Sequence, residues 1–343
     1  MIGAAILVTF LVFEIGLRVY EGIPVLRLTN FIADQVDRLS VVTHIDYDER
    51  LGWVGKPSAS ARHFNTGAYG IRLAGTVDRP IPQEAILAVG DSFTFGEEVE
   101  DDETWPADLE AITGTPVINA ATSGWGTDQI VMRAEAMLDI AHPKVLILGF
   151  FWQDIGRAEL EINFGAPKPY FTVEAGKVVL HNVPVPRFAG TVRELGFART
   201  LLGYSYAVFW LAQQLGFQEW LYAGHATFKR ATPPGSGEKI TCLLLQELKE
   251  KAGPDIRLML VMQYGFQDFA GDPPLAATHV LACAQGLGVA TVDTWTSLAR
   301  IHVADPVRLR SLYMTHQQVV THMSPAGNRL IAAEIARELQ AGN

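Results

Sequence analysis

A serine directly after a predicted buried strand is the first candidate for chemistry in this sequence of 343 residues. The short apolar run at 85–89 leads into Gly90-Asp91-Ser92, so Ser92 is predicted at the carboxyl end of a strand. Doubly wound α/β folds bind their ligands at this edge of the sheet. A serine hydroxyl held there can attack an ester carbonyl when a neighbouring base takes its proton. Ser92 is therefore a candidate nucleophile.

Three later segments carry polar residues at comparable places. Ser123-Gly124-Trp125-Gly126 follows one apolar run, and Gln153 and Asp154 follow the next. His322 stands shortly before the last predicted helix. Because parallel strands end at one edge of a sheet, these segments are expected to meet there.

Taken in order, the four segments resemble the conserved blocks of the SGNH/GDSL hydrolase family, over residues 85–340 with an insertion excepted. The resemblance implies a nucleophilic Ser92 and His322 as its base. It further implies that the Gly124 amide helps to bind the oxyanion, and that Gln153 stands where the family has an asparagine donor. The α/β-hydrolase motif Gly-x-Ser-x-Gly is absent, because Thr94 replaces its last glycine.

Gln153 is the first departure from the family pattern. Its amide lies one methylene farther from the backbone than that of asparagine, so the donor is displaced. Loss of one oxyanion donor lowers the rate about 10²- to 10³-fold.

The position of the catalytic acid is the second departure. The family has an aspartate two or three residues before the histidine, where this sequence has Val319 and Val320. Replacing the acid of a serine protease triad by its amide lowers turnover about 10⁴-fold. In some members of the family a backbone carbonyl holds the histidine instead. Asp154 and Asp305 are the candidate carboxylates that could orient His322 from elsewhere in the fold.

The hydrophobic pattern predicts the elements that position these residues. Short apolar runs that alternate with amphipathic segments favour a doubly wound α/β fold with a parallel sheet of the flavodoxin-like type. The predicted strands cover 85–90, 116–120, 144–151, 257–264 and 289–293. The predicted helices cover 104–112, 127–140, 238–252, 275–286 and 325–340.

This alternation stops between residues 156 and 234, which are predicted to be an insertion. Residues 171–182 indicate a hairpin, and the aromatic segment 201–224 contains Glu219 as its only charged residue. The segment could cap a cleft, lie at a membrane interface or bind a partner helix. The expected organisation is thus an anchor at 1–22, an extension at 23–84 and the hydrolase-like domain at 85–340.

The amino terminus predicts a transmembrane helix. Residues 1–20 approach the length of a membrane span if Glu14 and Arg18, four residues apart, pair near the headgroups. A cleaved signal peptide is less consistent, because a basic start and a small-residue cleavage site are missing. The segment 65–72 resembles one in a membrane-anchored bacterial branch of the family, which implies a single-pass protein with an extracytoplasmic domain.

Composition excludes some classes of function. The formal charge is −10 and there is no run of Lys or Arg, so nucleic acid is not expected as a partner. No metal-ligand spacing is present, and neither a metal nor a cofactor is predicted. The acidic cluster at 97–103 is interpreted as a solvated loop. Cys242 and Cys283 are interpreted as free buried thiols, although a single disulfide between them is the alternative.

Two functions remain open at this point. The two departures favour a catalytically impaired, membrane-anchored subunit of an energy-converting or envelope complex, which would contact lipid and other membrane proteins through its N-terminal helix and the segment 201–224. The alternative is a serine esterase that acts through Ser92 and His322 on acylated envelope lipids or O-acetylated glycans. A carboxylate within reach of the His322 ring would favour the enzyme.

Overall fold

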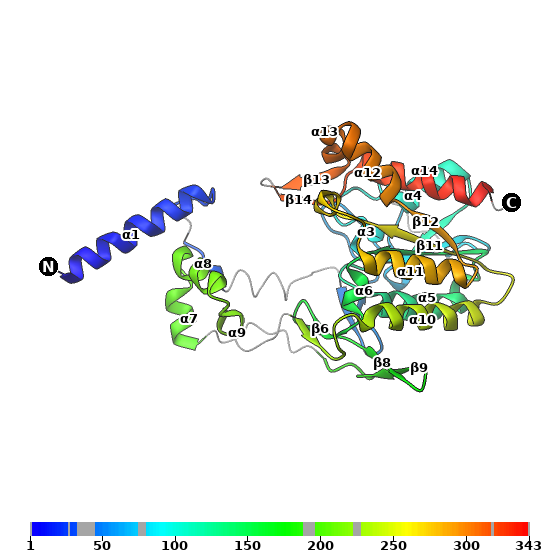
Figure 1. The fold of residues 1–343 in the computed structure, drawn as a ribbon, viewed down its shortest axis with the longest axis horizontal. Coiled ribbons are helices and arrows are strands. Elements are labelled where there is room, and N and C mark those ends of the chain that lie inside the picture. The colour runs from blue at the N-terminus through cyan, green and yellow to red at the C-terminus, as the bar shows by residue number, and fades with distance from the viewer. Residues whose placement is uncertain are drawn as a thin grey trace. The chain divides into compact units, whose positions relative to one another are not determined.

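The computed structural model describes residues 2–26, 28–32, 45–74, 80–187, 196–221, 228–316 and 319–341 (Figure 1). The chain forms two compact units. The smaller unit comprises residues 1–43, 162–166 and 188–229, and the larger unit comprises 44–161, 167–187 and 230–343. Residues 167–187 of the predicted insertion thus belong to the larger unit.

A five-stranded parallel sheet forms the centre of the larger unit. Its strands are β3 (Ile86–Gly90), β4 (Val117–Asn119), β5 (Val145–Phe151), β11 (Arg257–Gln263) and β12 (Ala290–Asp293). They are arranged in the order β12-β11-β5-β3-β4, and every neighbouring pair is parallel. Numbered along the chain, this is the 2-1-3-4-5 order of flavodoxin-like folds. The predicted α/β class and parallel sheet are confirmed.

Helices cover both faces of this sheet (Figure 1). One layer contains α4 and α14, which pack against each other, and the other contains α5, α10 and α11. Their bounds are α4 Trp105–Thr113, α5 Thr127–Ala141, α10 Ser236–Ala252, α11 Leu275–Gly286 and α14 Pro325–Ala341. Because both faces are covered, the central strands are apolar at nearly every position, and all five residues of β3 are buried.

Shorter elements complete the larger unit. The pair α12 (Trp295–Ala304) and α13 (Pro306–Ser311) precedes a hairpin of β13 (Tyr313–His316) and β14 (Val319–Met323). A second hairpin joins β1 (Ile45–Asp48) to β2 (Gly52–Gly55). The third joins β8 (Tyr170–Glu174) to β9 (Lys177–His181), which confirms the hairpin predicted at 171–182. Single-turn helices lie at η1 (Ala68–Gly70) and η2 (Phe266–Ala270).

The smaller unit is built from helices. They are α1 (Ile2–Tyr20), α7 (Gly196–Leu202), α8 (Tyr206–Gln214) and α9 (Gln218–Leu221). Short strands β6 (Leu160–Asn163), β7 (Ala166–Pro167) and β10 (Phe228–Arg230) lie where the chain passes between the units. The predicted pairing of Glu14 with Arg18 is present.

The expectation of a membrane-spanning helix at 1–20 finds no counterpart in the structure. None of the helices in the described residues combines the length and the apolar character that crossing a membrane requires.

The interpretation of the two cysteines as free thiols is wrong. Cys242 on α10 and Cys283 on α11 form a disulfide, with their Cα atoms 6.1 Å apart. The two helices pack against each other in one layer, so residues 41 positions apart in sequence come within bonding distance. The sequence pattern predicted both helices but not their contact.

Candidate active site

Ser92 is held at the end of β3 by the residue before it. Asp91 caps the short helix α3 (Ser92–Phe95), and its Oδ1 accepts a hydrogen bond of 3.0 Å from the Phe93 backbone N–H. The Ser92 hydroxyl, the first side chain of this helix, lies 3.4 Å from Asp91 Oδ2. Such caps fix the direction in which a helix leaves a strand. The strand, the cap and the helix together point Ser92 outward from the sheet edge.

Two glycines allow α3 to approach the sheet closely. Gly90 on β3 and Gly149 on β5 are partners in the parallel register. A Cβ atom at either glycine would collide with the Thr94 hydroxyl, which lies over both. Thr94, where α/β-hydrolases have glycine, is therefore part of the packing that places Ser92.

His322 lies beside Ser92, as expected from the sequence. It is carried by β14, and its Nε2 atom is 2.9 Å from Ser92 Oγ. The edge of the ring also packs on Phe93, with the ring centroids 5.1 Å apart. A neutral imidazole in this place can accept the proton of the serine hydroxyl.

The carboxylate at the other side of the ring belongs to Glu98. Its Oε2 atom lies 3.3 Å from His322 Nδ1, an ion-pair distance whose alignment falls short of a linear hydrogen bond. The same oxygen accepts hydrogen bonds from the Thr321 hydroxyl at 2.5 Å and from the His322 backbone N–H at 3.3 Å. Ser92, His322 and Glu98 therefore lie side by side in the order hydroxyl, imidazole and carboxylate.

Neither carboxylate that the sequence offered for this role is engaged with His322. Asp154 accepts hydrogen bonds from Arg157 and from the Phe151 backbone N–H. Asp305 caps α13 by accepting from the Arg308 backbone N–H. The carboxylate that faces His322 instead follows Ser92 by six residues, in a loop distant in sequence from the histidine.

Electrostatics of the site couple the acid to the base. Burial alone would lower the pKa of His322, but the contact with Glu98 and the charges of Glu97, Glu98 and Asp91 outweigh burial and raise it above 6.5. Burial raises the pKa of Glu98, and its bonds to His322 and Thr321 more than compensate, so that the pKa falls to about 2. Glu98 is therefore ionised at neutral pH and stabilises a protonated imidazole.

Arg72 holds the loop that carries Glu98. Its buried guanidinium donates to Asp101 at 3.2 Å and to the backbone carbonyls of Phe95 at 2.8 Å and Val99 at 2.7 Å. Burial lowers the pKa of Arg72 to about 10, so it stays charged. The backbone N–H of Asn65 also donates to Asp101.

The acidic cluster at 97–103 is therefore not simply a solvated loop. Asp101 is buried, and Glu98 faces the histidine. The loop is fastened by the segment 65–72 that resembled the anchored branch of the family. The proximity of six acidic residues to Ser92 was the signal available in the sequence, but only the fold shows which carboxylate reaches the ring.

Asp91 also belongs to a buried network of charged side chains. Arg157 Nη1 lies 3.5 Å from Asp91 Oδ2 and 2.5 Å from Asp154 Oδ1. It also donates to the Trp125 carbonyl at 3.1 Å. Burial and the charge of Asp91 raise the pKa of Asp154 well above its ordinary value. Arg157 thus links the cap of α3 to the loop that contains Gly124.

Gly124 lies in the loop after β4, in a left-handed conformation with φ of +79°. The β1–β2 hairpin fixes this loop, because Trp53 Nε1 donates to the Ser123 carbonyl and Trp125 Nε1 donates to the Trp53 carbonyl, both at 3.0 Å. Trp125 is fully buried and serves packing. The role of the Gly124 amide toward an oxyanion stays a prediction.

Gln153 lies just after β5, at the start of α6 (Asp154–Arg157). Its side chain is exposed, and its amide donates no hydrogen bond to the part of the protein that the structure describes. An amide in this state can turn toward a bound substrate. Its role as an oxyanion donor also stays a prediction.

Aromatic rings line the neighbourhood of His322. Phe93 stacks on Phe151 with centroids 4.5 Å apart. The half-buried Trp152 follows and donates from Nε1 to Asp268 at 2.8 Å. Phe93 therefore contacts the His322 ring, and Phe151 packs against Phe93.

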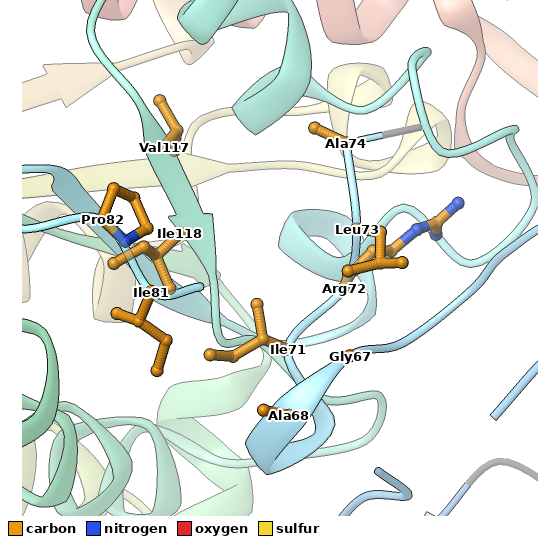
Figure 2. Close-up of a pocket in the computed structure, with 10 residues that line it drawn as sticks. All are labelled: Gly67, Ala68, Ile71, Arg72, Leu73, Ala74, Ile81, Pro82, Val117 and Ile118. Carbon is orange, nitrogen blue, oxygen red and sulfur yellow. The ribbon is translucent and has the colours of Figure 1, made fainter. Parts of the chain in front are cut away.

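A separate cavity of about 180 Å³ lies at the β4 edge of the sheet (Figure 2). Its lining includes Ile71, Ile81 and Ile118, and neither Ser92 nor His322 contributes to it. The described residues contain no cluster of three His, Cys, Asp or Glu side chains that could bind a metal ion.

The fold of this chain is similar to that of several solved structures, whereas its sequence finds no match. No protein-family model matches the chain, and no curated protein matches it. The chain is similar to a solved structure from Desulfitobacterium hafniense DCB-2 assigned to the lipolytic G-D-S-L family, at 16% identity over 75% of this chain and 99% of that one, with a TM-score of 0.38. It is also similar to an acetyl xylan esterase, at 12% identity over 73% and 97% with a TM-score of 0.43. A third is an α/β hydrolase enzyme from the metagenome of Lake Arreo, Spain, at 13% identity over 76% and 96% with a TM-score of 0.42.

Proposed function

We propose that this protein is a serine ester hydrolase. The observation that carries the proposal is the chain of contacts from Ser92 Oγ to His322 Nε2 and from His322 Nδ1 to Glu98 Oε2. A nucleophile, a base and an ionised acid in this order are what acyl transfer from an ester requires.

The reaction follows from these positions. His322 takes the proton of Ser92 as Oγ attacks the ester carbonyl, and Glu98 stabilises the imidazolium that forms. The backbone amides near Ser92 and Gly124 hold the oxyanion, and Gln153 adds its side-chain amide. Collapse of the intermediate gives His322's proton to the leaving alcohol. His322 then takes a proton from water, and the hydroxide attacks the acyl group on Ser92. When the carboxylic acid leaves, His322 returns this proton to Oγ.

The accessory role favoured by the sequence rested on two missing groups. Glu98 supplies the acid, so the larger of the two objections to catalysis no longer applies. The displaced amide of Gln153 remains as an objection, but the rate loss expected from one missing oxyanion donor is smaller than that expected from a missing acid. No contact in the described residues specifically favours an inactive subunit.

The proposed substrate class is an acylated envelope lipid or an O-acetylated glycan, with the hydrolase domain outside the cytoplasm. The Cys242–Cys283 disulfide supports this location, since such bonds persist in oxidising compartments and are rare in the cytosol. The Phe93 ring beside His322 supports an ester with an apolar group.

Hydrolysis of p-nitrophenyl acetate and labelling by a fluorophosphonate probe test the activity. The full-length protein should hydrolyse the ester and bind the probe, and Ser92→Ala should abolish both. Ser311→Ala, at an exposed serine on α13, is the matched control and should behave as the parent. A parent protein that neither turns over the ester nor takes the probe, or labelling that survives Ser92→Ala, would contradict the proposal.

A further inference from the structure

The helix α1 exposes apolar side chains on all sides. Every residue from Val8 to Phe13 is exposed, which is more than one full turn of helix. Val12 is 65% exposed and Val19 equally so. A helix that is apolar around its whole circumference belongs in a protein core or in lipid, and not in water.

The two charged residues of α1 are turned away from this surface. Glu14 and Arg18 are buried and form an ion pair at 2.5 Å. Glu14 also accepts hydrogen bonds from the Ser205 hydroxyl and from the backbone N–H groups of Tyr206 and Ala207, at 2.8 to 2.9 Å. These are the first donors of α8, so the carboxylate fastens α1 to the start of that helix.

Arg18 is equally satisfied within the smaller unit. Its guanidinium donates to the carbonyls of Val25 at 3.2 Å and Tyr204 at 2.8 Å. It also lies over the Phe31 ring, 5.0 Å from the centroid. The pair therefore removes both charges of α1 from the surroundings and joins two segments about 190 residues apart in sequence.

The segment 196–221, to which α1 is joined, is also apolar on its exposed side. Its exposed large apolar residues are Phe197, Leu201, Leu202, Tyr204, Leu211, Leu215 and Phe217, and Leu26 and Leu28 extend the same character. Monomeric soluble proteins rarely expose large apolar patches, and an exposed set of this size is typical of an interaction surface. The smaller unit therefore needs a partner that is itself apolar.

We propose that α1 and the segment 196–221 form one lipid-inserted unit, held together by the Glu14–Arg18 pair on the start of α8. Lipid is the occupant because exposure surrounds α1 over residues 8–13, whereas a second protein surface would cover one face. Among the described residues, the exposed side chains named above are all aliphatic or aromatic. The aromatic segment thereby enters the bilayer together with the N-terminal helix.

Nitroxide labels on the full-length protein in phosphatidylcholine vesicles test the insertion. Single cysteines replace Val12 and Leu215, while Val307 on α13, 79% exposed in the larger unit, provides the control. The two native cysteines are in a disulfide and do not react without reductant. Labels at 12 and 215 should collide with oxygen, which dissolves in lipid, and the label at 307 with an aqueous nickel complex.

Two results would overturn the insertion. Strong collision of either test label with the nickel complex would place it in water. Protection of both labels from both reagents would place the surface against protein, such as a second copy of the chain.

The role of the ion pair is tested in the same vesicles. Glu14→Ala should move the label at 215 into contact with the nickel complex while the label at 12 stays in lipid. Glu14→Gln, which keeps an acceptor oxygen, should show a smaller shift, and Glu21→Ala, at an exposed neighbouring carboxylate, should show none. A label at 215 that remains in lipid in Glu14→Ala would show that the pair does not join the segments. Ester hydrolysis by the same samples is a separate readout, so failure of insertion and failure of catalysis are distinguishable.

Discussion

Each of the two units contains a carboxylate that neutralises a cation, and the two pairs serve different ends. In the smaller unit, Glu14 and Arg18 have all their polar atoms directed at helix ends and carbonyls. In the larger unit, Glu98 holds His322 on one side only, and the other ring nitrogen faces the Ser92 hydroxyl.

The two pairs differ in the second group that the cationic side chain contacts, besides its carboxylate. A guanidinium that donates to backbone carbonyls has no proton to exchange at ordinary pH, so its pair can only join segments. An imidazole between a carboxylate and a hydroxyl can take up and release a proton. The same kind of charge neutralisation therefore joins segments in one unit and, in the other, serves the proposed proton transfer.

Removal of the base tests the catalytic side of this comparison most strongly. His322→Ala should lower kcat for p-nitrophenyl acetate by about 10⁴- to 10⁶-fold, because Asp91, the other acceptor near the Ser92 hydroxyl, is engaged by Arg157 and the Phe93 backbone N–H. The initial rate of nitrophenol release measures it. A loss below about tenfold would mean that His322 is not the base.

Replacement of the acid should have the next largest effect. Glu98→Gln should lower kcat by up to about 10⁴-fold, since the imidazolium loses its counter-charge. His322 must be neutral to act, so activity rises with pH through its raised pKa. Without the Glu98 charge that pKa falls, and the rising limb of kcat/KM should shift to lower pH.

The pH profile of kcat/KM for parent and variant is the measurement. Asp305→Asn is the matched control, at a carboxylate that caps α13 and has no contact with His322. A limb that stays in place in Glu98→Gln would show that Glu98 does not act on the histidine.

Loss of the displaced oxyanion donor should cost less. Gln153→Ala should lower kcat about 10²-fold with KM little changed, because the amide acts on charge that develops in the transition state. Steady-state kinetics of the parent protein and of Gln153→Ala separate the effect on kcat from the effect on KM. An unchanged kcat would mean that the longer side chain does not reach the oxyanion.

The smallest effect on catalysis is expected when a carboxylate of the smaller unit, Glu14, is replaced by an amide. Glu14→Gln should lower the rate on a soluble ester by less than tenfold, while amide hydrogen exchange at 205–207 should increase because the carboxylate that binds these N–H groups is weakened. Hydrogen exchange followed by mass spectrometry reports it. Equal exchange in both proteins would contradict the structural role of Glu14.

The sequence by itself determined the local features of this protein. Continuous apolar runs predicted the five strands, because strands covered on both faces must be apolar throughout. The Gly-Asp-Ser segment and the position of His322 before the last helix predicted that these two side chains meet, because both stand at fixed places relative to their elements. The four-residue spacing of Glu14 and Arg18 predicted their pairing along one helix.

Tertiary structure alone decided the contacts between segments distant in sequence. Nothing in the spacing of Glu98 distinguishes it from its acidic neighbours, and Arg72 and Asp101 fix the loop that brings it to His322. The same holds for the Cys242–Cys283 bond and for Glu14 at the start of α8. Periodicity reports which face of an element is buried, but which elements meet depends on the packing of the whole chain, and that packing decides which carboxylate faces His322.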